Sequence, residues 1–319
     1  MSPLALATNL ESSEGEFCDA LLKGLFRTPK RIAAKYFYDA AGSELFERIT
    51  ALPEYYPTRT ELALLQANAP EIAALIGPDV ELVEFGAGSL RKVRILLDVL
   101  ERPRAYAPID ISGDYLLQVA AALDDDYPQL RLKPVIGDFT QAIALGPLVA
   151  GARRRAGFFP GSTIGNFTRV EAFAFLRQAR QTLGGGGLLI GVDLVKDPAI
   201  LHAAYNDAQG VTEAFNKNLL ARANREAGAD FDLDAFAHHA CYNPLAQRIE
   251  MYLVSRKDQR VRIGGEVARF AQGEAVHTED SHKYTLAGFR ALAAEAGYVQ
   301  RHVWTDAAAL FSVQWLEQA

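Results

Sequence analysis

The first half of the chain carries carboxylates and glycines where apolar runs end. An apolar run over residues 80–85 leads into Gly86 and Gly88, and Glu84 stands just before them. Because glycine lacks a Cβ atom, a strand-to-helix turn built on these glycines can press its N–H groups against a polar ligand near a helix N-terminus. We therefore predict a ligand site at this turn, made by Glu84, Gly86, Gly88, Ser89 and Lys92.

Two further apolar runs also end in carboxylates. Residues 105–110 end in Asp110, which can accept hydrogen bonds from both hydroxyls of a ribose. Residues 131–139 end in Asp138 and Phe139, a carboxylate for an adenine amino group and a ring for the adenine face. Arg91 stands where a dinucleotide-binding turn carries its third glycine, which disfavours a nicotinamide or flavin cofactor. Together the strand ends resemble the S-adenosylmethionine site of class I methyltransferases.

The elements that would position these residues alternate between strand and helix up to residue 197. We predict a fourth strand over 156–163, a fifth over 187–195, and a helix between them. The apolar face of this helix holds Phe173, Leu176, Ala179 and Leu183. Strands that alternate with helices of this length imply right-handed crossovers and a mainly parallel sheet. The predicted fold class is α/β, with a Rossmann-like sheet of the class I methyltransferase type.

The pattern changes after residue 198. Residues 199–228 have a helical pattern, whereas residues 247–255 alternate with a period of two and are expected to pair with 259–263 as a hairpin. A helix over 286–296 and strands over 298–305 and 310–316 would complete the first sheet with an antiparallel edge. We therefore predict an S-adenosylmethionine-binding domain of residues 59–197 plus 283–319, and an inserted α+β substrate-binding domain of residues 8–58 plus 198–282.

The composition of the chain disfavours two classes of binding partner, nucleic acids and anionic membranes. The 319 residues include 33 basic and 39 acidic side chains, and the net charge of -6 argues against nonspecific binding to nucleic acid or anionic membranes. No uninterrupted apolar run reaches the roughly 18 residues that a membrane span needs. Cys18 and Cys241 suggest neither a disulfide framework nor a zinc site. We expect a monomeric, cytoplasmic protein that acts on a small molecule.

Several strings in the chain together resemble one family, the histidine-specific (L-histidine Nα-) methyltransferases of ergothioneine biosynthesis. Two are long and unusual: Pro-Glu-Tyr-Tyr-Pro-Thr-Arg within 52–61, and Gly-Ser-Thr-Ile-Gly-Asn at 161–166. The others lie at 36–39, 193–197, 205–207 and 248–251. The resemblance extends from about residue 29 to the C-terminus.

This resemblance implies an activity and a set of site residues. Such enzymes transfer methyl groups from S-adenosylmethionine to the α-amino group of histidine three times, and the product is hercynine. By the same resemblance, the imidazole would contact Tyr56, Met251, Glu279 and Ser281, the carboxylate Asn166 and Tyr205, and the amine Tyr38, Gly161 and Thr163. Tyr38 or a water would accept the proton that the amine must lose.

Plainer interpretations of the same residues stay open at this point. Tyr56 and Met251 could belong to the core, Asn166 could cap the next helix, and Glu279 could be a solvated acid. His277 and His282 flank Glu279, but without a third ligand such a string more often faces water, so we expect no metal. The alternatives for function are an N-methyltransferase of another free amino acid such as tryptophan, and a nucleotide-cofactor-binding protein or dehydrogenase.

Overall fold

The computed structural model describes residues 13–88, 90–111 and 113–319. These residues form two compact units. The larger unit comprises residues 50–205, 242–249 and 280–319, and the smaller unit comprises 13–49, 206–241 and 250–279. The assignment of cofactor binding to residues 59–197 plus 283–319, and of substrate binding to the rest, stays a prediction.

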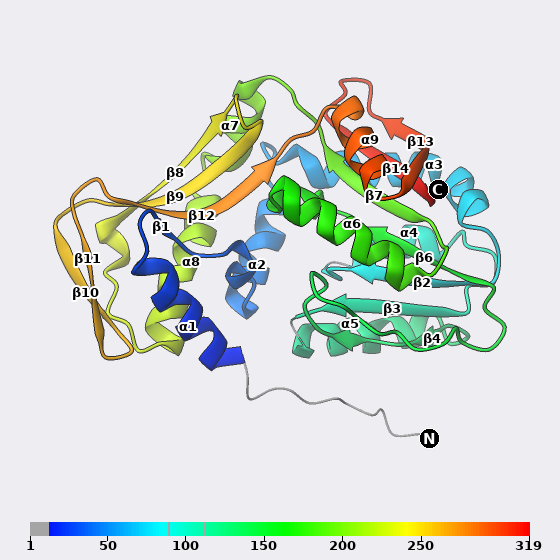
Figure 1. Ribbon diagram of the computed structural model, residues 1–319, viewed down its shortest axis with the longest axis horizontal. Helices are drawn as coiled ribbons and strands as arrows, with labels where there is room; N and C mark the ends of the chain where they lie inside the picture. Colours follow the sequence, from blue (N-terminus) through cyan, green and yellow to red (C-terminus); the bar gives the residue numbers. More distant parts are fainter. Residues whose placement is uncertain (1–12, 89, 112) are drawn as a thin grey trace. The chain divides into compact units, whose positions relative to one another are not determined.

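The larger unit is built around an eight-stranded sheet with the order β13-β14-β7-β6-β2-β3-β4, in which β5 also pairs with β3 (Figure 1). Strands β2 to β7 of this sheet pair in parallel, whereas β14 is antiparallel to both β7 and β13. The predicted antiparallel edge is therefore confirmed. The strands are β2 Val80–Phe85, β3 Ala105–Asp110, β4 Arg131–Leu132, β5 Val135–Ile136, β6 Arg154–Phe159, β7 Leu188–Asp193, β13 Tyr298–Thr305 and β14 Phe311–Gln318.

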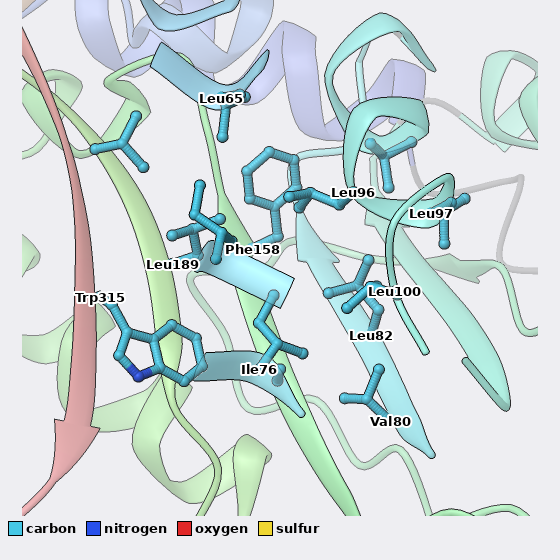
Figure 2. Packing of buried hydrophobic residues seen from close by; sticks show 14 of the residues in the cluster. Leu65, Ile76, Val80, Leu82, Leu96, Leu97, Leu100, Phe158, Leu189 and Trp315 are labelled. Carbon is cyan, nitrogen blue, oxygen red and sulfur yellow. The ribbon is translucent and has the colours of Figure 1, made fainter. Parts of the chain in front are cut away.

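Helices cover both faces of this sheet. Successive strand residues point to opposite faces, so the neighbours Leu82 and Val83 belong to two different buried clusters. Figure 2 shows the first cluster, in which Leu65 and Ile76 of α3 and Leu96 of α4 gather over the strands. Helices α6 and α9 supply the second cluster. The predicted α/β, Rossmann-like class is confirmed. The helices of this unit are α3 Tyr56–Ile76, α4 Leu90–Leu97, α5 Gly113–Asp126, η3 Thr163–Asn166, α6 Arg169–Leu183, α7 Pro198–Tyr205 and α9 Leu286–Glu295.

Local sequence sets both ends of α6. The side chain of Thr168 accepts a hydrogen bond from the Glu171 N–H, and the Glu171 side chain accepts one from the Thr168 N–H, which is a capping box. Gly184 ends the helix in the left-handed conformation, with φ of 55°. Because Thr168 is the N-cap, the interpretation of Asn166 as the cap of this helix is wrong.

The smaller unit holds a four-stranded sheet with the order β1-β12-β9-β8 and a separate two-stranded sheet, β10-β11. Its helix α8 contributes Phe215, whose ring stacks on Phe37 with centroids 4.5 Å apart. No described helix of either unit is both long enough and apolar enough to cross a membrane. The elements that lie wholly or mostly in this unit are α1 Ser13–Leu25, β1 Lys30–Arg31, η2 Ala34–Phe37, α2 Ala40–Thr50, α8 Val211–Glu226, η4 Leu233–Ala235, β8 Phe236–Asn243, β9 Arg248–Ser255, β10 Gln259–Ile263, β11 Glu266–Phe270 and β12 Ala275–His282. Residues 50, 242–243, 248–249 and 280–282 of α2, β8, β9 and β12 belong to the larger unit.

The predicted hairpin of 247–255 with 259–263 is wrong. Strand β9 lies between β12 and β8, and β10 pairs with β11. Ile263 lies opposite Glu266, so Gly264 and Gly265 form a two-residue turn, and both have positive φ, 55° and 90°. Tight hairpin turns of this kind need left-handed backbone at both central positions, which glycine adopts without strain.

Two other predicted elements are interrupted. The third strand, 131–139, is present only as the two short strands β4 and β5, because Pro134 between them has no N–H to donate to a neighbouring strand. The helical stretch 199–228 is two helices, α7 and α8. Asp207 stands between them and accepts hydrogen bonds from the Val211 and Thr212 N–H groups at 2.9 and 2.8 Å, which starts α8 anew.

Candidate functional site

The parallel strands bring several predicted residues to one edge of the larger unit's sheet. In the pairing register Phe85 lies opposite Ile109, and Asp110 lies opposite Ile136. The carboxyl ends of these strands are therefore level, and open α/β sheets bind ligands at such ends. The polar residues and glycines at this edge, or just after it, are Glu84, Gly86, Asp110, Asp138, Gly161 and Asp193.

The turn after β2 uses its own N–H groups. The N–H groups of Gly86 and Ala87 both donate to the Ile109 carbonyl, at 2.9 and 3.1 Å, and the Gly88 N–H donates to the Gly86 carbonyl at 3.0 Å. These N–H groups bond within the protein in this structure, and the ligand site at this turn stays a prediction. A Cβ atom on Gly88 would meet no atom within 4 Å, so the turn borders open space. Ser89 lies outside the described residues.

Glu84 is a buried carboxyl group at the end of β2, only 2% exposed. Tyr106 donates its phenol hydrogen to Glu84 Oε2. Burial raises the pKa of Glu84 to about 8, although the Tyr106 hydrogen bond and the Lys92 charge oppose this shift. The carboxyl is therefore mostly protonated at neutral pH.

We expect Glu84→Gln to gain stability relative to the wild type as the pH rises. The pKa of Glu84 is about 8 in the folded protein, against an ordinary value of 4.5. Between these values the folded state holds a proton that the unfolded state has lost, so the wild type loses stability with rising pH, and the amide does not. Urea unfolding of both proteins at about pH 5 and about pH 9 measures this difference. A difference in unfolding free energy that is equal at both pH values would contradict the prediction.

The carboxylates after β3 and β5 are held in place differently. Asp110, the last residue of β3, is half-buried. Asp138 Oδ1 accepts hydrogen bonds from the Thr140 N–H at 2.9 Å and from the Thr140 hydroxyl at 2.5 Å, which fixes the orientation of the carboxylate. The neighbouring Phe139 packs against the second core cluster, and a Cβ atom on Gly86 would lie 3.2 Å from its ring. The absence of a side chain at Gly86 thus leaves room for this ring.

Glu61 joins two predicted site residues. This carboxylate of α3 is 1% exposed and lies 2.6 Å from the Lys92 ammonium. The Gly161 N–H donates to both Glu61 oxygens at 2.9 Å. Gly161 has φ of 78°, a left-handed conformation that favours glycine. Glu61 therefore brings Lys92, a predicted cofactor residue, together with Gly161, a predicted amine-pocket residue.

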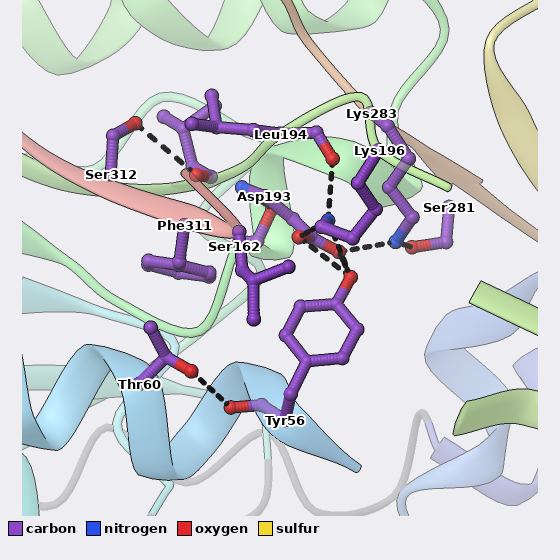
Figure 3. Close-up of polar contacts among 12 residues, drawn as sticks. Tyr56, Thr60, Ser162, Asp193, Leu194, Lys196, Ser281, Lys283, Phe311 and Ser312 are labelled. Carbon is purple, nitrogen blue, oxygen red and sulfur yellow. Dashed lines mark hydrogen bonds and ion pairs between the residues drawn. The ribbon is translucent and has the colours of Figure 1, made fainter. Parts of the chain in front are cut away.

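A buried carboxylate at the end of β7 binds two lysines and a tyrosine (Figure 3). The Tyr56 phenol donates to Asp193 at 2.8 Å, Lys196 Nζ lies 2.5 Å from Asp193 Oδ1, and Lys283 Nζ lies 2.7 Å from Asp193 Oδ2. Burial alone would raise the pKa of Asp193, but the charges of Lys283 and Lys196 outweigh it and hold the pKa below its ordinary value. Burial lowers the pKa of Lys196 to about 8, against the attraction of Asp193. Asp193, Lys196 and Lys283 together therefore bury two cationic side chains and one anionic side chain.

Lys283 also contacts two residues that the sequence assigns to substrate binding. Its ammonium donates to Ser281 Oγ at 2.8 Å and to the Tyr205 phenol oxygen at 3.1 Å. The Tyr205 phenol donates to Ser281 Oγ at 2.7 Å. Ser281 is 6% exposed and Tyr205 8%. Tyr56, Tyr205 and Ser281 therefore belong to one buried network centred on Asp193 and Lys283.

Thr163 and Asn166 lie in η3, beside β7. The Thr163 hydroxyl donates to the Pro160 carbonyl at 3.1 Å, and Asn166 is the half-buried last residue of the short helix. Ser162, just before η3, is left-handed with φ of 55°, and its Oγ accepts from the Asp193 N–H at 2.8 Å. The loop with the predicted amine-pocket residues is therefore tied to the Asp193 network.

The remaining predicted residues lie in the smaller unit. The Tyr38 ring packs edge-on against Phe46 and Phe215, with centroids 5.6 and 5.7 Å away. Met251 is 1% exposed in β9. Glu279 is 9% exposed in β12, so its interpretation as a solvated acid is wrong. Among the residues that the structure describes, no group of three or more histidine, cysteine and carboxylate side chains could hold a metal ion.

Sequence reasoning gave no role to Glu61, Asp193, Lys196 or Lys283. A signal for Asp193 was present, since this acid directly follows the apolar run of β7. Lys283 follows Ser281 by two residues in the chain. From the sequence, a lysine in this polar stretch is expected to be a solvated charge. Only the fold shows that the side chain of Lys283 is 1% exposed.

Comparison with known proteins gives the same family over nearly the whole chain. Histidine-specific, S-adenosylmethionine-dependent methyltransferases match residues 17–318. The chain is 46% identical to the histidine N-alpha-methyltransferase of Mycolicibacterium smegmatis over 297 aligned residues, and this alignment covers 91% of each of the two chains. It is 28% identical to the 4-dimethylallyltryptophan N-methyltransferase of Epichloe festucae var. lolii over 329 aligned residues, and this alignment covers 95% of each of the two chains. Among solved structures, the CcbJ methyltransferase from Streptomyces caelestis has a TM-score of 0.46 and 17% identity, over 79% of this chain and 95% of that one.

The strings that suggested a family in the sequence lie inside the matched region. Those within 52–61 and at 161–166 supply Tyr56 and Gly161, both of which the structure places in the larger unit. Because the match covers residues 17–318 and a relative is 46% identical over 91% of the chain, this chain belongs to the histidine-specific, S-adenosylmethionine-dependent methyltransferases.

Proposed function

We propose that this enzyme transfers methyl groups from S-adenosylmethionine to the α-amino group of L-histidine, three times in succession, and releases hercynine. The observation that carries the proposal is the buried contact of Tyr205, Ser281 and Lys283, because it joins two residues expected to bind the substrate. The 46% identity to a histidine N-alpha-methyltransferase supports the same substrate.

The residues at the strand ends fit S-adenosylmethionine by their chemistry. The Asp110 carboxylate suits a ribose diol, Asp138 suits an adenine amino group, and the open space beside Gly88 leaves room for the ligand. When bound, S-adenosylmethionine supplies an electrophilic methyl group on a sulfonium. We propose that the residues that hold it are Glu84, Gly86, Gly88, Ser89, Lys92, Asp110, Asp138 and Phe139.

Two residues of one strand would recognise the imidazole. Glu279 and Ser281 are two positions apart in β12, so their side chains leave the same face of the strand. A buried carboxylate that accepts an imidazole N–H makes a charge-assisted hydrogen bond, and it disfavours rings without such a donor. Met251 and Tyr56 would flank the ring. Asn166 and Tyr205 are the residues expected at the carboxylate.

The amine end requires a proton acceptor and free space. An α-amino group titrates at about 7.7–8.0 in peptides, so a modest shift leaves enough neutral amine to attack the methyl group. Tyr38, or a water, would take the proton. We propose that Gly161, which has no side chain, and Thr163, whose hydroxyl donates to the Pro160 carbonyl, line the place where the amine gains one methyl group in each round. Positioning of the amine then supplies most of the rate.

Product analysis tests the proposal directly. The protein is incubated with S-adenosylmethionine and a pool of free amino acids, and mass spectrometry follows each amino acid. Histidine should gain one, two and then three methyl groups. A gain on tryptophan instead would show a different substrate within the same chemistry. Nicotinamide binding without methyl transfer would support the dehydrogenase alternative.

We expect Asp110→Ala to weaken cofactor binding far more than histidine binding. The carboxylate stands at the end of β3, where it would accept two charge-assisted hydrogen bonds from a ribose. Loss of two such bonds corresponds to a rise in the Kd of S-adenosylhomocysteine of about 100-fold or more. Calorimetry of the wild type and the variant measures it. If S-adenosylhomocysteine still bound the variant as tightly as the wild type, Asp110 would not be the ribose acceptor.

A further inference from the structure

Glu61 occupies a place beside β7 that only glycine leaves open. Its side chain is 1% exposed, and a Cβ atom on Gly191 of β7 would lie 2.0 Å from its Oε1. No side chain could take that place without displacing the carboxylate. Gly161 meets the same carboxylate with its N–H, at 2.9 Å from both oxygens. Glu61 is therefore enclosed by two glycines and has little room to move.

One contact of Glu61 leads to the cofactor. Lys92 belongs to α4, the helix after the turn at the end of β2, and its ammonium lies 2.6 Å from Glu61 Oε2. The side chain of Lys92 is 14% exposed, so solvent screens this ion pair only weakly. An ammonium group carries three N–H donors, so Lys92 can bind Glu61 and still donate to a ligand such as the carboxylate of S-adenosylmethionine. Glu61 thus sets the place of a residue that we expect to hold the cofactor.

The other contact of Glu61 holds a loop in an unfavourable conformation. Gly161 and Ser162 both have left-handed backbone, with φ of 78° and 55°. A serine in this conformation costs free energy, which other contacts must offset. Glu61 holds Gly161 through its N–H, and the Asp193 N–H donates to Ser162 Oγ at 2.8 Å. A Cβ atom on Gly161 would lie 3.4 Å from Lys92 Nζ, so the loop passes directly beside the ammonium.

We propose that Glu61 is a positioning residue for methyl transfer, because it fixes the loop of Gly161 relative to Lys92. This inference rests on the proposed function, in which Lys92 holds the methyl donor and Gly161 lines the place of the amine. One carboxylate then sets the distance between the two reactants without contact to either. Methyl transfer needs the reacting atoms about 3–3.5 Å apart, and a misplacement of about 1 Å can slow such a step by about 100-fold. Loss of Glu61 should therefore slow the chemical step far more than it weakens cofactor binding.

A purely structural ion pair would behave differently, and the larger unit offers one for comparison. Glu81 is 0% exposed, and it accepts hydrogen bonds from Lys133 at 2.9 Å and from the Val149 N–H at 3.1 Å. It also pairs with Arg155 at 3.3 Å. Glu81 therefore binds a lysine and a loop N–H, as Glu61 does. It lies near the amino end of β2, whereas the predicted cofactor residues lie at the carboxyl end of this strand and beyond.

The experiment separates the chemical step from binding. The single-turnover rate of histidine methylation, at saturating S-adenosylmethionine and histidine, reports the chemical step, and calorimetry gives the Kd of S-adenosylhomocysteine. Glu61→Gln removes the charge that holds Lys92 and keeps an oxygen for the Gly161 N–H. The rate should fall about 100-fold, whereas the Kd should not rise, because Lys92 keeps its own charge. Glu81→Gln, the matched control, should change neither the rate nor the Kd.

Glu61→Asp tests the position of the carboxylate apart from its charge. The variant keeps a buried counter-charge for Lys92, but its shorter side chain cannot reach both Lys92 and the Gly161 N–H. The single-turnover rate should again fall, by about tenfold or more. Because this variant leaves no lysine without a counter-charge, it tests the inference even if Glu61→Gln does not fold.

The possible results separate this inference from the proposed function. A wild-type rate in either Glu61 variant would overturn the inference, as would an equal loss of rate in Glu81→Gln. A large rise in the Kd of S-adenosylhomocysteine in Glu61→Gln would show that Glu61 serves cofactor binding, and the inference would be wrong. If the wild type bound S-adenosylhomocysteine but did not methylate histidine, the proposed function would fall, and the inference with it.

Discussion

Glu279→Ala should lower kcat/KM for histidine by about 10⁴-fold and leave the Kd of S-adenosylhomocysteine unchanged. Sites built to pair a polar group of the substrate lose about this factor when the pair cannot form. Glu279 is 9% exposed, so water cannot readily replace the lost carboxylate. Steady-state kinetics with histidine and calorimetry with S-adenosylhomocysteine give the two numbers.

Glu279→Gln is the matched variant for this prediction. The amide keeps an oxygen that can accept from the imidazole N–H, but it lacks the charge, and a neutral hydrogen bond has roughly half the strength of a charge-assisted one. Its loss of kcat/KM should therefore lie between those of the wild type and of Glu279→Ala. Equal losses of histidine use and of cofactor affinity in Glu279→Ala would show that Glu279 acts on the whole fold and not on the imidazole.

Asp193→Asn should destabilise the protein by about 3–5 kcal/mol, because it leaves the ammonium groups of Lys196 and Lys283 buried without a counter-charge. The exposed fraction of these two side chains is 4% and 1%, so solvent cannot compensate. The free energy of unfolding in urea, measured on wild type and variant at neutral pH, gives the size of the effect. The larger unit, which holds all three residues, is where the loss should occur.

A surface ion pair of the same unit provides the control. Arg301 and Glu317 lie 3.0 Å apart with side chains 55% and 39% exposed, and such pairs contribute about 0–1 kcal/mol. Glu317→Gln should therefore change the unfolding free energy much less than Asp193→Asn. The double variant Asp193→Asn, Lys283→Met should lose less than the sum of the single losses, because it removes one of the unpaired cations. A loss in Asp193→Asn no larger than in Glu317→Gln would contradict the account of this network.

The sequence predicted the fold where local signals and burial agree. The apolar run of β2 and the glycines after it predicted a strand that ends in a turn, and the apolar face of residues 173–183 predicted α6. The prediction was wrong where a nearby competing signal was stronger. Gly264 and Gly265 form the hairpin turn that the alternating pattern of 247–255 had suggested elsewhere, and Pro134 interrupts the third strand.

The site was predictable only in part, because spacing along the chain reveals residue types but not the direction of hydrogen bonds. Strings of the family assigned Tyr205 and Ser281 to the substrate, and the structure brings them together. What no pattern could show is that one lysine, Lys283, donates to both, or that Glu61 ties Lys92 to Gly161. Except for Lys283 with Ser281, these contacts join residues far apart in the chain, and they appear only once the sheet is formed.

The place of β14 in the sheet has a consequence for the biosynthesis of this enzyme. This strand lies between β7 and β13, and it pairs Phe311 with Asp193 and Leu316 with Leu188. A ribosome that adds about 5–20 residues per second needs on the order of ten seconds to travel from β7 to β14. Throughout that interval the nascent chain carries β7 as an open strand edge, a template for pairing with other polypeptides. Aggregation of this protein in an expression host should therefore depend on translation speed and on chaperone supply.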